Sequence, residues 1–295
     1  MGKVFEALKK SDQGGVSGAS LDVPVSGTTE SVEDAMPSVT SSSPAGDRAE
    51  IVRKRQAAQD FGDWDEILTV ASSVNTAVIE NFRSLRTRIL HPDEGAPPKT
   101  ILVTSATPGE GKSFVCANLG ISFAQGIDHY SLLVDADLRR PMLARLFGRP
   151  NASGLVNYLR DKQDLSGLIA TTGVNKLTLL PAGPPPVNPA ELLGSEYMSA
   201  FVNELAERYE DRLVIFDSPP LHAATETAIL ANLVDAVVLV VRWGNSRREH
   251  VKALVDRIGK EKIVGIVFNA YKSTMIDSKV FGDYAYHSEY SYEEK

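Results

Sequence analysis

Apolar runs alternate with amphipathic segments along the second, larger part of the chain. Short runs rich in β-branched residues and leucine predict strands at 100–105, 130–135, 176–180, 212–217, 235–242 and 262–268. Helical spacing of the apolar residues between these runs predicts helices at 112–125, 154–160, 195–209, 222–232 and 246–258. Such alternation is typical of a parallel sheet covered on both faces. The pattern therefore predicts an α/β fold with a doubly wound, mostly parallel sheet that binds its ligand at the carboxyl ends of the strands.

One more amphipathic helix is predicted just before the sheet, at 77–90. Glu80, Arg83 and Arg86 are three residues apart in it, so their side chains form one charged stripe along the helix. The stripe fits two interpretations. It is either a solvated face with an internal ion pair or a contact with another subunit.

Residues 1–75 have a different composition. Most of this stretch is rich in Ser, Gly, Thr, Pro and acidic residues, and no aromatic residue occurs between Phe5 and Phe61. Such a segment buries too little apolar surface to offset the entropy of ordering it. We therefore expect a largely disordered tether, with ordered structure from about Thr76. Phe61 and Trp64, which lie among acidic residues, form a candidate docking patch.

Composition excludes several classes of protein. The net charge of −7 and pI of about 5.4 argue against nucleic acid as a partner. The single cysteine, Cys116, excludes a disulfide framework and a four-cysteine metal centre within one chain, and we expect it to be a buried packing residue. No run of eighteen apolar residues is present. We therefore expect a soluble, cytosolic protein that reaches a membrane only through a partner.

The stretch from Ser105 to Ser113, SATPGEGKS, joins the first predicted strand to the helix that follows it. A strand, a glycine-bearing loop, Lys-Ser and a helix are the parts of a phosphate-binding P-loop. Gly109 and Gly111 allow backbone N–H groups to turn toward phosphates, Lys112 supplies a charge, and Ser113 supplies a hydroxyl to Mg²⁺. The expected nucleotide contacts are Thr107, Pro108, Gly109, Glu110, Gly111, Lys112, Ser113 and Phe114.

Acidic residues follow two of the other predicted strands. LLVDADLRRP places Asp135 and Asp137 just after one strand, and LVIFDSPP places Asp217 just after another. In a parallel sheet these positions cluster beside the P-loop, where carboxylates can hold Mg²⁺ and accept a proton from a nucleophile. We expect Ser113, Asp137 and Asp217 at the metal. The spacing leaves open whether Asp135 or Asp137 is the general base.

The end of the chain, residues 277–295, is predicted to be a flexible acidic tail with an unusual number of tyrosines. Four of the nine tyrosines of the chain, Tyr284, Tyr286, Tyr290 and Tyr292, lie within it. A tail that packs on the surface would explain aromatic rings but not the choice of tyrosine over phenylalanine.

Together these motifs resemble the bacterial tyrosine kinases of the polysaccharide co-polymerase system, which are P-loop proteins of the partition-ATPase-like superfamily. The variant Walker A motif lies at 106–113, the Walker A′ motif at 132–139 and the Walker B motif at 213–220. The stretch 181–193 resembles a further family motif, and the charged stripe looks like the family's subunit-contact helix. The resemblance covers roughly 76–295. Two features depart from it: there is no transmembrane domain, as in the split form of the family, and Glu226 stands where an Asp is common.

The resemblance implies a kinase domain at 76–276 that uses Mg·ATP to phosphorylate the tyrosine tail of a neighbour in a homo-oligomeric ring. Lys112 would neutralise charge on the transferred phosphoryl group. It also implies a membrane-embedded co-polymerase whose cytosolic segment activates the kinase, and a phosphatase that resets the tail. The protein would lie in the cytoplasm, peripheral to the inner membrane, and control synthesis and export of capsule or exopolysaccharide.

Two other functions fit parts of the sequence. A partition or positioning ATPase of the same superfamily would carry a second lysine early in the P-loop, where this chain has Thr107. A catalytically silent ATP-binding regulatory subunit would not need the intact set of Lys112, Asp135, Asp137 and Asp217.

Overall fold

The computed structural model describes residues 64–68, 76–208, 211–221 and 226–271. Tyr284, Tyr286, Tyr290 and Tyr292 lie outside this part of the chain, as does most of the predicted tether.

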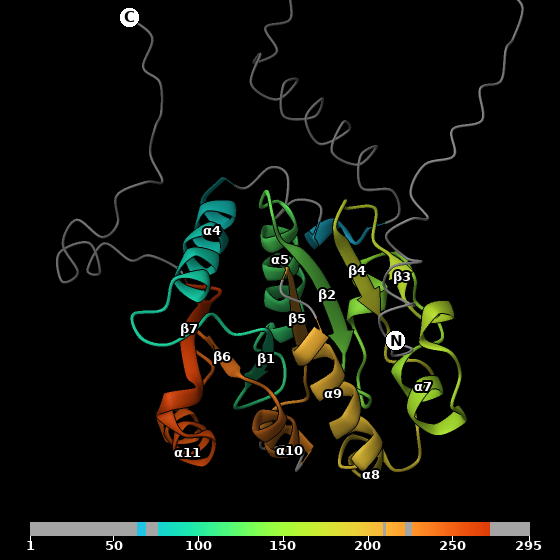
Figure 1. Ribbon diagram of the computed structural model, residues 1–295. Helices are drawn as coiled ribbons and strands as arrows, with labels where there is room; N and C mark the ends of the chain where they lie inside the picture. The colour runs from blue at the N-terminus through green and yellow to red at the C-terminus, as the bar shows by residue number, and fades with distance from the viewer. Residues whose placement is uncertain (1–63, 69–75, 209–210, 222–225, 272–295) are drawn as a thin grey trace, which may run out of the picture.

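A single seven-stranded sheet organises the described residues, with the strand order β3-β4-β2-β5-β1-β6-β7 (Figure 1). Its strands are β1 (Thr100–Ser105), β2 (Tyr130–Asp135), β3 (Ala170–Thr171), β4 (Leu177–Leu180), β5 (Arg212–Asp217), β6 (Ala236–Arg242) and β7 (Ile263–Asn269). All neighbours are parallel except β3, which runs antiparallel to β4. The six predicted strands are confirmed with ends shifted by at most one residue. The short edge strand β3 was not predicted.

Helices connect the strands and cover both faces of the sheet. They are α4 (Thr76–Leu90), α5 (Lys112–Ala124), α6 (Leu143–Leu146), α7 (Leu155–Asp161), α8 (Pro189–Leu193), α9 (Glu196–Arg208), α10 (Glu226–Leu233) and α11 (Arg248–Ile258), with short 3₁₀ turns at Leu165–Gly167 and Lys260–Lys262. The one-turn helices α6 and α8 were not predicted. The start of the predicted helix 222–232 falls on residues outside the described part.

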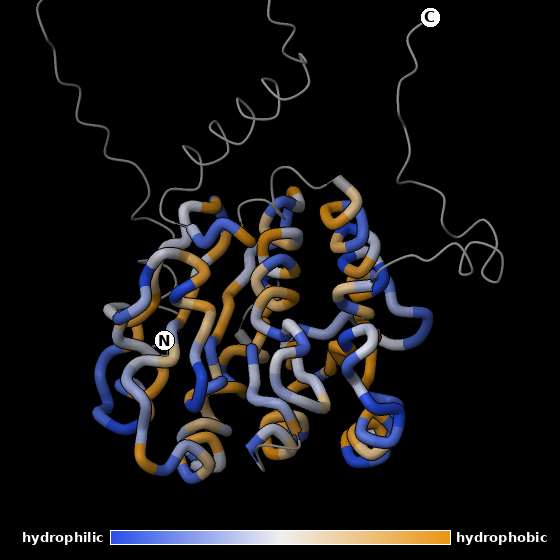
Figure 2. Tube along the Cα trace, turned by 180° about the vertical axis from the view of Figure 1, so that it is seen from behind, coloured by the Kyte–Doolittle hydropathy of each residue, from blue (hydrophilic) through white to orange (hydrophobic). Residues whose placement is uncertain are grey.

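Alternate residues of each strand enter two separate hydrophobic clusters, as expected when side chains point to opposite faces of a sheet. One cluster contains Leu133 and Ile215 and is closed by α4, α5 and α6. The other contains Leu132 and Val214 and is closed by α7 to α11. Figure 2 shows the hydrophobic segments gathered in the sheet and on the inner sides of the helices. The doubly wound α/β fold is thereby confirmed.

Trp64 and Leu68 belong to the packed core, although the sequence analysis assigned residues 64–68 to the tether. Trp64 is 8% exposed, its Nε1 donates to the carbonyl of Thr172 at 2.8 Å, and its ring meets Phe147 edge-on at 4.9 Å. Leu68 is fully buried. Ordered structure therefore begins before Thr76, and Trp64 is not available as a docking patch. The composition around Trp64 could not indicate that its hydrogen-bond acceptor, Thr172, and its aromatic neighbour, Phe147, lie far along the chain.

The charged stripe of α4 divides into two parts. Glu80 and Arg83 form an ion pair, and both side chains are more than half exposed. Arg86 instead donates to the carbonyl of Ser122 and so ties α4 to α5. Only the first two residues of the stripe therefore present free surface.

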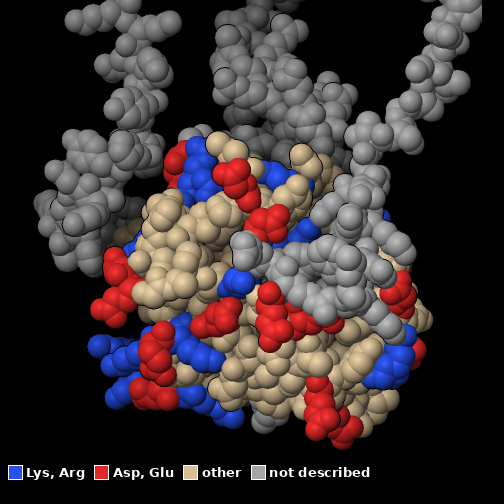
Figure 3. All heavy atoms as spheres, viewed as in Figure 1, with Lys and Arg blue, Asp and Glu red and all other residues tan. Residues whose placement is uncertain are grey.

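The surface of the described residues is mixed in charge. Figure 3 shows basic and acidic side chains interspersed over α11. Within the described part of the chain, no helix combines the length and apolar character needed to span a bilayer. Cys116 is fully buried, as predicted.

Candidate active site

The P-loop and both acidic motifs meet at the carboxyl edge of the sheet. Strands β2, β5 and β1 are neighbours, and Asp217 aligns with Asp135 of β2 and with Val103 of β1. The backbone continues this alignment beyond the strands, since Ala136 N donates to the Asp217 carbonyl at 2.8 Å. The motifs predicted to form one site are thus brought together by adjacent strands.

Two glycines give the P-loop its shape. Gly109 and Gly111 have φ angles of 78° and 93°, in the left-handed region that favours glycine. At Gly111 a Cβ atom would also lie 2.0 Å from Nδ2 of Asn269. Helix α5 begins directly afterwards at Lys112, so its first N–H groups and partial positive charge face the loop. This is the cradle for an anion that the sequence predicted.

The side chains of Glu110 and Thr107 brace the loop from inside. Glu110 is fully buried and accepts hydrogen bonds from the backbone N of Thr107 at 3.2 Å, from the Thr107 hydroxyl at 2.9 Å and from the Ser246 hydroxyl. Both residues were predicted as nucleotide contacts. Their side chains contact each other, and most of their backbone groups are also bonded within the protein. The Thr107 N–H donates to Glu110, and the carbonyls of Thr107 and Glu110 accept from Ser105 and Asn269. Phe114, also predicted there, packs edge-on toward Phe82 of α4.

Two residues from the ends of β6 and β7 support the loop from outside. Arg242 Nη1 donates to the Gly109 carbonyl at 2.9 Å, and Asn269 Nδ2 donates to the Glu110 carbonyl at 2.8 Å. The sequence analysis missed both. Their position could have indicated this role, because each is the last residue of a strand and therefore lies at the P-loop edge of the sheet.

Asp135 is fully buried and is held by the start of helix α6. Its Oδ2 accepts from the backbone N atoms of Met142 at 3.1 Å and Leu143 at 3.0 Å. Its Oδ1 is buried without a hydrogen-bond partner among the described residues. Burial, with the neighbouring Asp217 second, raises the pKa of Asp135 well above the usual range of a carboxyl group.

The other two carboxylates differ in access. Both oxygens of Asp217 are buried and make no hydrogen bond of good geometry in the described part of the chain, although the Ser113 hydroxyl and the Ser218 N–H lie close enough to lower its pKa. Burial raises the pKa of Asp217 to about 7, although Lys112 and the hydroxyl of Ser113 oppose the rise. Asp137 is 6% exposed, and its Oδ1 accepts from the backbone N of Arg140 at 3.0 Å. Burial raises the pKa of Asp137 as well, against the Arg140 hydrogen bond and Lys112.

The donor set fits a hard cation. Three buried carboxylate oxygens, one on Asp135 and two on Asp217, make no hydrogen bond of good geometry among the described residues, and such oxygens are ligands that Mg²⁺ prefers. Within that same part of the chain, no group of three or more His, Cys, Asp or Glu side chains is arranged to hold a metal by itself. This agrees with Mg²⁺ chemistry, in which one or two carboxylates act together with phosphate oxygens and water.

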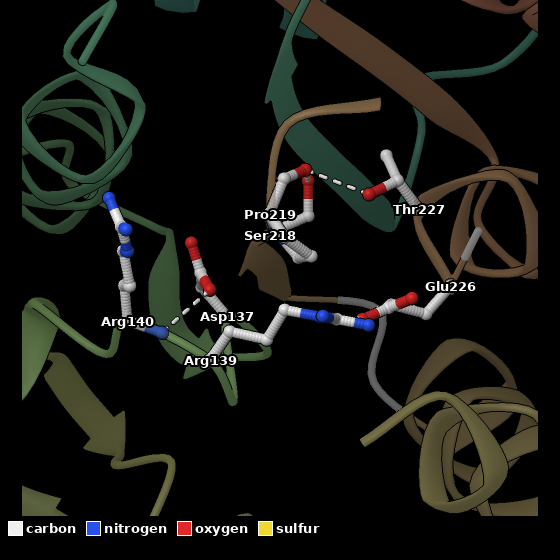
Figure 4. Close-up of polar contacts among 7 residues, drawn as sticks. All are labelled: Asp137, Arg139, Arg140, Ser218, Pro219, Glu226 and Thr227. Atoms are coloured by element: carbon white, nitrogen blue, oxygen red, sulfur yellow. Dashed lines mark hydrogen bonds and ion pairs between the residues drawn. The ribbon is translucent and has the colours of Figure 1, made fainter. Parts of the chain in front are cut away.

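An ion pair joins the first acidic motif to the start of helix α10 across the site (Figure 4). Arg139 Nε lies 2.6 Å from Oε1 of Glu226, the first residue of α10, whose side chain is fully buried. The next residue, Thr227, donates to the Pro219 carbonyl at 2.8 Å. The sequence analysis noted Glu226 only as a departure from the family pattern and did not predict this pair. The extra methylene of Glu, compared with Asp, is consistent with the reach to Arg139.

Curated relatives of the chain are tyrosine kinases. It is 35% identical over 227 residues to tyrosine-protein kinase YwqD of Bacillus subtilis, an alignment that covers 76% of this chain and 89% of YwqD. It is 31% identical over 208 residues to tyrosine-protein kinase CpsD of Streptococcus agalactiae, covering 70% of this chain and 89% of CpsD. No family model matches the chain.

Solved structures give the same result. The kinase domain of the Escherichia coli tyrosine kinase ETK aligns with a TM-score of 0.62 and 29% identity over 70% of this chain and 82% of that one. The chimerical protein CapA2B2 aligns with a TM-score of 0.63 and 29% identity over 75% of this chain and all of that one. These relatives favour a kinase over a partition ATPase or a silent regulatory subunit. The chain therefore belongs to the bacterial P-loop tyrosine kinases and is a nucleotide-binding protein-tyrosine kinase.

Proposed function

We propose that the chain is a Mg·ATP-dependent autokinase that phosphorylates its own tyrosine tail in trans. The observation that carries this proposal is the alignment of Asp135 with Asp217 beside Lys112, with three buried carboxylate oxygens that make no hydrogen bond of good geometry among the described residues. Two buried carboxylates lower the stability of the protein when no cation is bound. Beside a metal–nucleotide complex, the same carboxylates are stabilised by the positive charge of the metal. The four acceptors are Tyr284, Tyr286, Tyr290 and Tyr292.

Each residue of the P-loop side has a role in this proposal. The backbone N–H groups of 109–113 and the Lys112 ammonium hold the β- and γ-phosphates, and Lys112 offsets the charge that develops on the transferred group. Ser113 would bind Mg²⁺ directly, and Asp137 and Asp217 would hold its waters. When bound, this ion would neutralise phosphate oxygens.

Asp137 is the better candidate for the general base. Asp135 is fully buried with one oxygen bound to α6, whereas Asp137 retains some access to solvent. Its raised pKa also makes it a stronger proton acceptor than an ordinary carboxylate. The tyrosine oxygen would attack the γ-phosphorus, its proton would pass to Asp137, and the bond to the β-phosphate oxygen would break to release ADP.

Assembly and cellular role complete the proposal. The exposed Glu80–Arg83 pair of α4 contacts a neighbouring subunit in a homo-oligomeric ring, so that each tail reaches the site of another copy. A membrane-embedded polysaccharide co-polymerase activates the ring through its cytosolic segment, and a phosphatase resets the tail. The kinase is thereby peripheral to the inner membrane and regulates capsule or exopolysaccharide synthesis and export.

The test uses two variants of the full chain. Lys112→Met keeps the length of the side chain and removes its charge, so it should fold and lose all phosphotyrosine. The variant with Phe at the four tail tyrosines should keep its kinase activity and lose its own phosphorylation. When the two are mixed with Mg·ATP, mass spectrometry should find phosphate on the Lys112→Met tail. Absence of phosphate there, while wild type modifies itself, would show that the reaction is not in trans.

A further inference from the structure

Residues 64–68, here called the N-terminal strap, join the edge of the sheet to the end of helix α6. The backbone N of Asp65 donates to the Leu146 carbonyl at 3.0 Å, and the Trp64 ring packs edge-on against Phe147 at 4.9 Å. On the other side, Trp64 Nε1 donates to the Thr172 carbonyl at 2.8 Å. The Thr172 hydroxyl in turn donates to the Leu177 carbonyl in β4 at 3.0 Å. The strap therefore fixes the end of α6 to the sheet.

The opposite end of α6 holds Asp135. The N–H groups of Met142 and Leu143 both donate to its Oδ2. One helical turn links the two ends, through bonds from Leu146 N to the Met142 carbonyl at 3.0 Å and from Phe147 N to the Leu143 carbonyl at 3.1 Å. Two continuous lines of hydrogen bonds and contacts thus run from the strap to Asp135.

Helix α6 has only four residues, Leu143–Leu146. A helix this short has no stability of its own, so its position is set by what packs against it. Without the strap, the Leu146 carbonyl would lose the Asp65 N–H and the Phe147 ring would lose its neighbour. The two N–H groups that hold Asp135 would then be free to shift. Displacements of about 1 Å around a reacting centre can cost about 100-fold in rate.

We infer that Trp64 is a positioning residue for the kinase reaction, acting through α6 on Asp135. This inference rests on the proposed function, in which the buried Asp135–Asp217 pair lies beside the bound metal–nucleotide complex. It makes the strap part of the catalytic domain, although it precedes α4 and every motif of the site in the sequence.

The first test measures the contact path without using activity. In Trp64→Ala, the amide hydrogens of Met142 and Leu143 should exchange with solvent faster than in wild type. Leu205→Ala is a matched control, because it removes a fully buried side chain from α9 on the other face of the sheet. In that control, exchange at Met142 and Leu143 should stay at the wild-type rate. Unchanged exchange in a folded Trp64→Ala protein, or equal acceleration in both variants, would overturn the inference.

The second test separates rate from affinity. At saturating Mg·ATP, Trp64→Ala should autophosphorylate about 10-fold to 100-fold more slowly than wild type. Its ATP affinity should change by less than about twofold, because the contacts described for the strap are with Leu146, Phe147 and Thr172 rather than with the P-loop. Trp64→Phe keeps a ring against Phe147 and should recover most of the rate. A wild-type rate in Trp64→Ala would refute the positioning role. If Trp64→Ala fails to fold, Phe147→Leu tests the same contact from the other side.

Asp135→Asn distinguishes failure of this inference from failure of the proposed function. If Asp135→Asn keeps the wild-type rate, the proposal that the Asp135–Asp217 pair serves the metal–nucleotide site is wrong, whatever the strap does. If Asp135→Asn is inactive while folded Trp64→Ala is fully active, only the inference about the strap is wrong.

Discussion

Asp135 and Asp217 lie directly opposite each other on the parallel strands β2 and β5, and both side chains are fully buried. Burial is the main cause that raises the pKa of both groups, to about 7 for Asp217 and well above the usual range for Asp135, where Asp217 adds to the effect. When both carboxyl groups are ionised, two negative charges lie close together where water solvates them poorly. The nucleotide-free protein is therefore destabilised by the residues that serve its reaction.

The stability of the nucleotide-free protein should fall as pH rises from about 5 to about 7.5. In the unfolded chain these carboxyls titrate near 3.8, so above that pH the unfolded chain has lost protons that the folded protein still binds. The free energy of unfolding then decreases by up to about 1.4 kcal/mol per pH unit for each such group until the folded group titrates. Thermal unfolding followed across this range measures the effect.

Asp217→Asn is the control for that pH dependence. It removes one buried charge, so at about pH 7.5 it should unfold at a higher temperature than wild type, with a flatter pH profile. The same variant should be inactive as a kinase. A wild-type unfolding temperature that rises between pH 5 and 7.5 would contradict the assignment.

Glu110→Gln should weaken ATP binding by about tenfold, or about 1.4 kcal/mol. All the hydrogen bonds of the Glu110 side chain come from donors on Thr107 and Ser246. A glutamine would place an NH₂ group against one of these donors and distort the loop. Calorimetric titration with Mg·ATP measures the loss. Thr107→Ser keeps the hydroxyl and should bind ATP as wild type does. Unchanged affinity in Glu110→Gln would show that the brace does not shape the loop.

Truncation of Arg139 and truncation of Glu226 should lower the free energy of unfolding by different amounts. The Glu226 side chain is fully buried, whereas that of Arg139 is 46% exposed. Arg139→Ala leaves a buried carboxylate unpaired and should lower the free energy of unfolding by about 1–3 kcal/mol. Glu226→Ala leaves a guanidinium that water can reach, so its cost should be smaller. Urea unfolding at neutral pH compares the two, with Arg140→Ala as an exposed control. Equal losses would mean that packing, rather than the unpaired charge, sets the cost.

Arg83→Ala should separate the role of α4 in assembly from its role in the fold. The Arg83 side chain is exposed and forms its ion pair with Glu80 on the same helix, so its loss should leave the unfolding temperature unchanged while the ring dissociates. Arg86→Ala also removes the contact with Ser122 on α5 and should lower stability as well. Light scattering measures the mass. A full-size assembly in Arg83→Ala would make the Glu80–Arg83 pair a solvated ion pair.

The sequence predicted the central part of the fold because its signals are local. The strands of the sheet are continuous apolar runs, and the P-loop carries its own glycines, so both could be located without tertiary information. The edge strand β3, Ala170–Thr171, is too short to show a pattern, and α6 is a single turn. These elements are formed by packing rather than by local preference.

The contacts that were missed join residues far apart in the sequence. Trp64 donates to the Thr172 carbonyl, and Arg139 forms an ion pair with Glu226. No local pattern predicts such pairs. The role of Glu110 was missed for a different reason. Its position within the P-loop suggested a ligand contact, but its side chain turns inward and accepts from Thr107.

The outer supports of the P-loop also determine when the chain can first hold a nucleotide during its synthesis. The glycines and Lys112 leave the ribosome early, but the loop is fixed by Arg242, Ser246 and Asn269, which are made more than 130 residues later. A nascent chain that ends before β6 thus contains the complete phosphate-binding motif without the groups that shape it. We therefore expect the full nucleotide affinity only after β7 has joined the sheet and Asn269 has reached the loop.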